Sequence, residues 1–211
     1  CYLNSAGISP VDGKAYATVL NYEVGSYLIR FDETRVEFLA KLYELNSFKL
    51  DFNAGAMATN GTFYIHSSSR LWSMESVDEL TGYSSSSDAS IPDWSAMGPT
   101  VTSTVSLGAD FVVLDTGEFE GGSTQRYAIG AHTGYVRVIN LDTGEGWLLE
   151  ASTMAGTWGS AWLYDGKVYM ASDDGTTGVY RVDVDLVAES VETTYMALSA
   201  ETGLNDGMNC L

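Results

Sequence analysis

Gly134-Tyr135-Val136-Arg137-Val138-Ile139-Asn140-Leu141-Asp142 is followed later in the chain by Gly178-Val179-Tyr180-Arg181-Val182-Asp183-Val184-Asp185. Both stretches place a glycine before a strand of alternating apolar and polar residues, and their arginines lie 44 residues apart. A repeat of about 40 to 50 residues built from short strands is typical of the blades of a β-propeller. The two stretches therefore indicate the fold class that the rest of the sequence has to support.

Four parts of the chain share this pattern of a glycine turn and a strand that carries a tyrosine. The marker tyrosines are Tyr16, Tyr64, Tyr127 and Tyr169, at spacings of 48, 63 and 42 residues. The long middle spacing contains residues 81–104, in which a serine run and two prolines predict a long loop or a degraded hairpin. We predict an all-β fold, a small propeller of four four-stranded blades, or five if residues 81–104 form one, with the ring closed near the termini. A β-sandwich is the alternative, because it is also built from short alternating strands.

The length of the chain favours one domain. At 211 residues it can bury enough surface for a single core, so residues 1–211 are predicted to be one β-propeller domain. Helical periodicity is nearly absent, and only residues 77–80 are expected to form a single helical turn. No apolar run approaches the length of a membrane span, and the N-terminus lacks the pattern of a signal peptide. We therefore expect no membrane insertion.

The charge of the chain is strongly negative. It has 28 acidic and 10 basic side chains, a net charge of -18. Phosphate backbones and anionic membranes would repel such a surface, so nucleic acid is not an expected partner and cations are. Residues 1–105 carry 12 acids and 6 bases, whereas residues 106–211 carry 16 acids and 4 bases, so a cation site is expected in the second half. The alternative is that the acidity only keeps the protein in solution.

Two acidic stretches are candidates for a Ca²⁺ site. Ca²⁺ takes six to eight oxygen ligands, which clustered carboxylates supply. The candidate ligands are Asp110, Asp115, Glu118 and Glu120 in one stretch, and Asp173 and Asp174 in the other. Neither stretch matches an EF-hand loop, so two interpretations stay open, a metal site and a solvated loop.

The only two cysteines, Cys1 and Cys210, lie at opposite ends of the chain. A disulfide between them would close a ring-shaped fold. Alternatively, Cys1 is the lipidated cysteine of a processed lipoprotein, or it pairs with a neighbouring module. Asn60-Gly61-Thr62 is an N-glycosylation sequon at a predicted turn, which agrees with a secreted glycoprotein.

Motifs for catalysis are scarce. The chain has two histidines, no Gly-x-Ser-x-Gly elbow and no metalloprotease helix motif. Two of its carboxylates could meet as a glycosidase pair, but the sequence does not select which two. We therefore expect the chain not to be an enzyme.

A resemblance to a known group of domains rests on several turn-rich stretches. These are Gly7-Ile8-Ser9-Pro10-Val11-Asp12-Gly13-Lys14-Ala15-Tyr16, Gly108-Ala109-Asp110-Phe111, Gly159-Ser160-Ala161-Trp162, Asp173-Asp174-Gly175 with Gly178-Val179-Tyr180, and Asn205-Asp206-Gly207-Met208-Asn209-Cys210. Together they resemble an extracellular propeller-like domain of algal and protist cell-surface proteins, including proteins of flagellar hairs (mastigonemes). The resemblance implies a structural or adhesive module at the cell surface. It identifies no binding residue.

Two functions follow as expectations. The first is a non-catalytic extracellular structural or interaction module, a building block of a filament or coat, whose partners are neighbouring protein modules, copies of itself or glycans. The alternative is a carbohydrate-binding or carbohydrate-active propeller that uses exposed aromatic side chains, with Trp94, Trp147 and Trp158 as candidates. Blade packing is the competing interpretation for each of these tryptophans.

Overall fold

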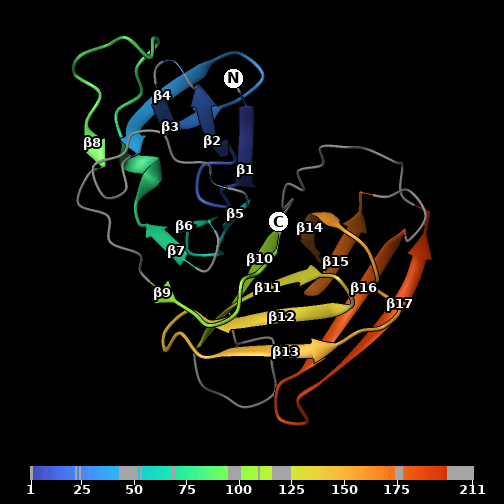
Figure 1. Cartoon of the computed structure of the whole chain (residues 1–211). Coiled ribbons are helices and arrows are strands. Elements are labelled where there is room, and N and C mark those ends of the chain that lie inside the picture. Colours follow the sequence, from blue (N-terminus) through green and yellow to red (C-terminus); the bar gives the residue numbers. More distant parts are fainter. Residues whose placement is uncertain are drawn as a thin grey trace.

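The computed structural model describes residues 2–21, 23, 25–42, 52, 54–67, 70–94, 101–108, 110–115, 125–173 and 178–198. These residues form four separate sheets that follow one another along the chain like the blades of a propeller (Figure 1). The predicted all-β class is confirmed, and the described residues form four sheets in series instead of the two layers of a sandwich.

The first two sheets each gain a short strand from the chain that follows them. Sheet one contains β1 (Tyr2–Ile8), β2 (Ala15–Asn21), β3 (Gly25–Phe31), β4 (Val36–Leu42) and β8 (Asp93–Trp94). Sheet two contains β5 (Ala54–Met57), β6 (Phe63–Ser67), β7 (Arg70–Met74) and β9 (Val101–Thr102). The predicted helical turn is confirmed as a 3₁₀ helix, η1 (Val77–Glu79).

The last two sheets are regular four-stranded meanders. Sheet three contains β10 (Phe111–Asp115), β11 (Arg126–His132), β12 (Tyr135–Asn140) and β13 (Gly146–Glu150). Sheet four contains β14 (Trp158–Tyr164), β15 (Lys167–Ser172), β16 (Val179–Asp185) and β17 (Ser190–Ala197). All neighbouring strands within each of these two sheets are antiparallel.

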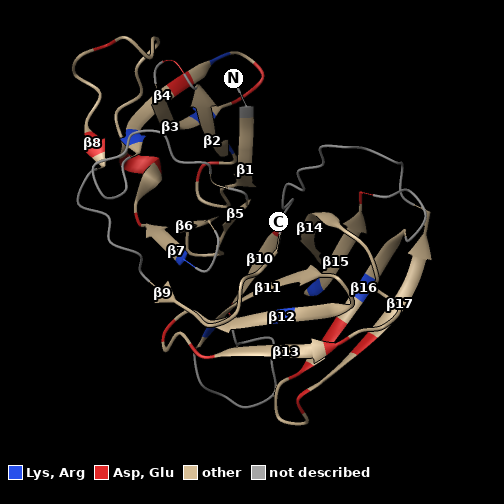
Figure 2. Ribbon diagram, in the orientation of Figure 1, with Lys and Arg blue, Asp and Glu red and all other residues tan. Residues whose placement is uncertain are grey.

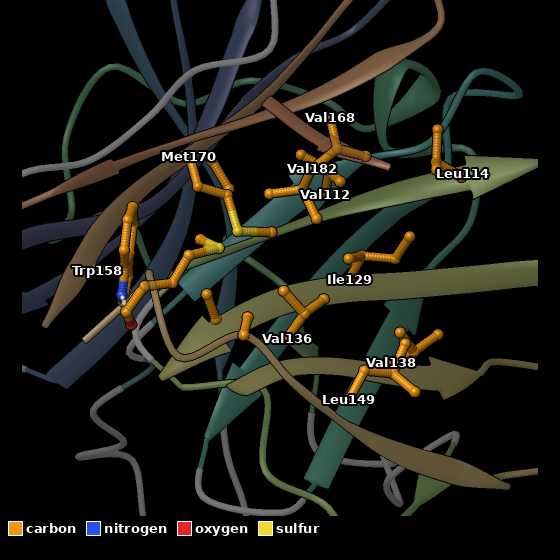
Figure 3. Packing of buried hydrophobic residues seen from close by; sticks show 14 of the residues in the cluster. Val112, Leu114, Ile129, Val136, Val138, Leu149, Trp158, Val168, Met170 and Val182 are labelled. Atoms are coloured by element: carbon orange, nitrogen blue, oxygen red, sulfur yellow. Dashed lines mark hydrogen bonds between the residues drawn. The ribbon is translucent and has the colours of Figure 1, made fainter. Parts of the chain in front are cut away.

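Each sheet packs against the next through buried side chains. Aromatic and aliphatic residues fill the space between sheets one and two, and a second cluster joins sheets two and three. The third and largest cluster lies between sheets three and four (Figure 3). Its members include Val112, Leu114, Ile129, Val136, Val138, Leu149, Trp158, Val168, Met170 and Val182.

The first strands of the successive sheets, β1, β5, β10 and β14, are neighbours in space. Small residues allow this approach: Gly55 lies so close to β1 that a Cβ there would come within 2.7 Å of the Ser5 carbonyl oxygen. The Ser5 hydroxyl also donates a hydrogen bond of 3.2 Å to the Phe52 carbonyl oxygen. The inner strands therefore hold the sheets at a fixed distance from one another.

The described residues of the segment 81–104, which are 81–94 and 101–104, contribute to the first two sheets. Tyr83 and Phe38 exchange backbone hydrogen bonds of 2.8 and 2.9 Å, and the Tyr27 hydroxyl donates to the Ser86 carbonyl oxygen. Ile91 is buried against the outer face of sheet one, next to Ala17. In the described part of this segment, no fifth blade is formed, because its strands β8 and β9 extend sheets one and two.

The first sheet has its outer face covered, and in the part of the chain that the structure describes it is not joined to the last sheet by a buried cluster. The outer face of sheet one is covered by the segment around Tyr83 and Ile91. Among the described residues, no buried cluster joins sheet one to sheet four, so the predicted closure of the ring is not confirmed. Within the same residues, no helix is long and apolar enough to cross a membrane.

Candidate functional site

Three aromatic side chains lie on the outer face of sheet four. Along β14, Ala161 and Leu163 point into the cluster shared with sheet three, so Trp162 and Tyr164 point the opposite way. Tyr169 of β15 is the direct cross-strand partner of Trp162 and shares its face. We call Trp162, Tyr164 and Tyr169 the aromatic face.

A tight turn positions this face. Asp165 and Gly166 connect β14 to β15, and both have positive φ values of 49° and 67°, as a type I′ hairpin turn requires. The turn fixes the register in which Tyr164 pairs with Lys167 and Trp162 pairs with Tyr169. A shift by one residue would turn the rings into the core, so the register is strongly specified.

The three rings contact one another. Trp162 and Tyr169 stack with their centroids 5.9 Å apart and their planes within 13°. Tyr164 stands at 64° to Tyr169, with a centroid distance of 6.4 Å. Tyr164 is 67% exposed, whereas the other two rings are half-buried. Such offset and edge-on arrangements are favourable for aromatic pairs, so the rings hold one another in place.

Charged side chains continue the same face beside the rings. Arg181 of β16 is the cross-strand partner of Tyr169, and Asp183 lies two residues further along the strand. Asp183 accepts a hydrogen bond of 2.8 Å from Arg181 Nε, and its other oxygen lies 3.6 Å from Lys167 Nζ. The outer face of sheet four therefore combines apolar rings with a row of hydrogen-bonding groups.

Asp110 and Asp115 do not meet. Asp110 immediately precedes β10 and Asp115 is its last residue. The two are five residues apart, which corresponds to about 16 Å along a strand. Asp110 is 4% exposed and accepts a hydrogen bond of 3.2 Å from the Ala161 backbone N–H of sheet four. Asp115 accepts a hydrogen bond from the hydroxyl of Thr59, which lies in the turn between β5 and β6 of sheet two. Each carboxylate thus links two sheets, and one ion cannot bind both.

Of the other predicted calcium ligands, only Asp173 is among the described residues. Asp173 follows β15 and its carboxylate packs against Gly159 of β14. Glu118, Glu120 and Asp174 lie outside the described residues. Within the described part of the chain, no group of three or more histidine, cysteine, aspartate or glutamate side chains could hold a metal ion. Calcium binding stays a prediction.

The remaining predicted sites are the glycosylation sequon and the two cysteines, of which only the sequon is among the described residues. Asn60 is exposed in the turn between β5 and β6, and its side-chain oxygen accepts a hydrogen bond of 3.1 Å from the Thr62 N–H. This position is accessible to glycosylation, which stays a prediction. Cys1 and Cys210 lie outside the described residues, so their disulfide also stays a prediction.

The two histidines lie at or next to the ends of strands β11 and β6. His66 is fully buried at the end of β6, with its ring 6.1 Å from that of Phe111. His132 ends β11, where burial and then the nearby Arg137 charge lower its pKa. This shift favours the neutral form of the His132 side chain.

The tryptophans proposed for carbohydrate binding all pack against hydrophobic clusters, and one of them is fully buried. Trp158 is buried between sheets three and four, where its Nε1–H donates to the Met154 carbonyl oxygen at 3.1 Å. Trp147 and Trp94 are partly buried against the hydrophobic clusters. The aromatic face was missed, although one signal for it is in the sequence: Trp162 and Tyr164 alternate with two small or aliphatic residues in a predicted strand.

Comparison with known proteins assigns the chain to a family. A family described as a repeat of unknown function (DUF6923) matches residues 1–211. The chain belongs to this family. No curated protein matches its sequence.

A solved enzyme structure shares the fold. A gluconolactonase from Xanthomonas campestris, described as important in glucose secondary metabolic pathways, superimposes with a TM-score of 0.57 at 10% sequence identity. The match covers 99% of this chain and 66% of the gluconolactonase, so the chain spans about two thirds of that protein. Apo AztD from Citrobacter koseri matches more loosely, with a TM-score of 0.44 at 12% identity over 95% of this chain and 47% of AztD.

The gluconolactonase corrects one expectation. The sequence predicts that the chain is not an enzyme, because it lacks familiar catalytic motifs. That prediction is wrong in its reasoning: a protein with the same fold is an enzyme, so the lack of familiar motifs does not exclude catalysis. Catalysis has to be tested together with binding.

Proposed function

We propose that this chain is a carbohydrate-recognising domain of the propeller type, and that the aromatic face of sheet four binds the sugar. The observation that carries the proposal is the group of Trp162, Tyr164 and Tyr169 on the outer face of sheet four, in which Tyr164 is exposed and the other two rings are half-buried. In the described part of the chain, no other sheet packs on this group. Exposed groups of large apolar side chains with polar margins mark interaction sites on soluble proteins.

A sugar ring matches the chemistry of this face. The C–H groups of a pyranose form an apolar surface that stacks on an aromatic ring, while its hydroxyls at the ring edge need hydrogen-bond partners. Tyr164 offers an accessible ring, and Lys167, Arg181 and Asp183 offer donors and acceptors beside it. Because strands carry both groups, the site is held more firmly than a site on loops would be.

The fold supports the same choice by analogy. The gluconolactonase is an enzyme of sugar metabolism by its own description. Its identity to this chain is too low to transfer an activity or a residue, and the analogy only ranks sugars above other ligands that stack on aromatic rings.

Titration calorimetry with neutral hexasaccharides tests the proposal. The ligands are cellohexaose, xylohexaose and mannohexaose, and the variant is Tyr164→Ala. Truncating an aromatic anchor in a binding site costs about 2 kcal/mol, so we expect affinity for the best ligand to fall more than tenfold. Tyr135→Ala is the matched control, because Tyr135 is an exposed strand tyrosine of sheet three. It should leave affinity unchanged.

Equal loss in both variants, or no binding of any hexasaccharide, would contradict the proposal. The same samples are incubated with glucono-1,5-lactone, and proton release is followed. Hydrolysis above the spontaneous rate would make the domain a carbohydrate-active enzyme. Hydrolysis without oligosaccharide binding would place sugar recognition away from the aromatic face.

An extracellular location is a second part of the proposal. The exposed sequon at Asn60 supports it, and the resemblance to cell-surface modules of protists stays a prediction. Expression through a eukaryotic secretory pathway should add one glycan that Asn60→Gln removes. A protein that is secreted without a glycan would leave the location without this support.

A further inference from the structure

We infer that the aromatic face accepts uncharged glycans and excludes anionic ones, and that Asp183 determines this specificity. The inference rests on the proposed function, because it concerns the ligand class of the same face. It is carried by the arrangement of charges beside the rings and not by the rings themselves.

Asp183 occupies both cations that a sugar carboxylate would need. One of its oxygens accepts a hydrogen bond from Arg181 Nε at 2.8 Å, and the other lies 3.6 Å from Lys167 Nζ. A carboxylate on the ligand would have to displace Asp183 from these partners. Two carboxylates at one pair of cations repel each other, so the exchange brings little gain.

The neighbouring strand adds another negative charge. Glu192 of β17 is the direct cross-strand partner of Asp183 and therefore lies on the same face. Figure 2 shows a basic and an acidic position along β16 and an acidic position on the neighbouring β17. Lys167 and Arg181 are thus balanced by Asp183 and Glu192, in a chain whose net charge is -18. Neither the face nor the whole molecule attracts an anion.

Hydroxyl groups meet a different environment. A neutral sugar can donate hydrogen bonds to Asp183 or Glu192 and accept them from the exposed Lys167 without breaking an ion pair. Its ring can stack on the aromatic side chains at the same time. The face is therefore complementary to a polyhydroxylated, uncharged chain.

Asp183→Asn tests the inference as a gain of affinity. The substitution removes the charge that neutralises Arg181 and Lys167 and keeps a side chain of the same shape. Calorimetry compares cellohexaose with hexagalacturonate, which carries a carboxylate on every ring. Asp142→Asn is the matched control, because Asp142 pairs with Arg126 at 3.1 Å on sheet three, away from the aromatic face.

We expect the unmodified protein to bind cellohexaose and to bind hexagalacturonate at least tenfold more weakly. Asp183→Asn should raise affinity for hexagalacturonate about fivefold or more, as two freed surface cations predict, whereas affinity for cellohexaose, which loses a charged acceptor at Asp183, should not rise. Adding Arg181→Met should remove the gain, and so should high salt. Asp142→Asn should change neither affinity.

Three results would overturn the inference. Equal binding of both glycans to the unmodified protein would remove the charge discrimination while leaving the proposed function intact. An Asp183→Asn variant that gains nothing would remove the role of Asp183. Failure of every glycan to bind would remove the proposed function as well. If Tyr164→Ala then changes only a monomer–dimer equilibrium in analytical ultracentrifugation, the face is a contact between copies.

Discussion

Asp110 is a buried carboxylate whose role is to join two sheets. It lies next to β10 and accepts the backbone N–H of Ala161 in β14. Carboxylates are usually exposed, and a buried one is stabilised by the donors around it. The acidic residues of this chain therefore include structural links as well as surface charges.

Replacing Asp110 with alanine should destabilise the protein. The Ala161 N–H would lose its acceptor inside the protein, which costs about 1 to 3 kcal/mol. Urea denaturation of Asp110→Ala measures the change in the free energy of unfolding, and Asp88→Ala, at an exposed position, is the control. A change in Asp110→Ala no larger than in the control would contradict the assigned role.

Tyr64 makes the fold sensitive to high pH. Its hydroxyl accepts a hydrogen bond of 2.7 Å from Arg126 Nη1, which joins sheets two and three. Burial raises the pKa of Tyr64 from 10.0 to about 12. Between these pH values the unfolded chain loses a proton that the folded chain keeps, so stability present below pH 10 should fall as the pH rises toward 12.

Alkaline unfolding, followed by circular dichroism, tests this expectation. Tyr64→Phe removes the ionisable group, so its stability should depend less on pH above 10 than that of the unmodified protein. Tyr135→Phe should behave like the unmodified protein. An identical pH dependence in all three would show that Tyr64 does not control the transition.

At the scale of strands, the sequence predicts the tyrosine-bearing strands of all four sheets better than the inner strands of sheets one and two. The strands around Tyr16, Tyr64, Tyr127 and Tyr169 are found where the pattern places them. β1 and β5 carry small residues with no clear alternation, as in the Ala-Gly-Ala-Met sequence of β5. Their composition reflects the close approach of backbones between sheets, which no local pattern encodes.

The aromatic face is a second feature that the local sequence pattern does not determine fully. Alternation along β14 separates Trp162 and Tyr164 from Ala161 and Leu163, so the sequence could have grouped the rings. It could not show which of the two groups a neighbouring sheet covers. Only the packing of sheet three on sheet four shows which group is covered. For this reason the sequence wrongly suggested Trp147 and Trp158, which pack in or against the cluster between these sheets, as exposed sugar-binding side chains.

Gly55→Ala tests the close contact between inner strands. The added methyl group would meet the Ser5 backbone at 2.7 to 2.8 Å, and backbone atoms cannot move aside as a flexible side chain would. Overpacking of this kind typically costs about 1 to 3 kcal/mol. Thermal unfolding should show a clearly lower midpoint, and an unchanged midpoint would mean that β1 and β5 are further apart than described.

At the scale of the whole molecule, the four sheets form a series with one covered and one aromatic outer face. The sheets are confirmed, whereas closure of the ring is not. The chain matches about two thirds of a gluconolactonase, which has the same fold over that length. The predicted Cys1–Cys210 disulfide bears directly on closure.

A non-reduced peptide digest analysed by mass spectrometry tests that disulfide. A bridge across more than 200 residues would stabilise the fold by roughly 5 kcal/mol on the loop-entropy argument. Reduction should then lower the melting temperature markedly. Free thiols in the digest, or either cysteine joined to another chain, would remove the closure prediction.

The central claim is that the aromatic face of sheet four binds a neutral sugar. A crystal structure of the protein grown with cellohexaose tests it most directly. The account predicts sugar density stacked on Tyr164 or Trp162, with hydroxyls near Asp183 and with the Asp183 ion pairs intact. Sugar bound elsewhere, or another copy of the chain covering the three rings in the presence of excess sugar, would contradict it.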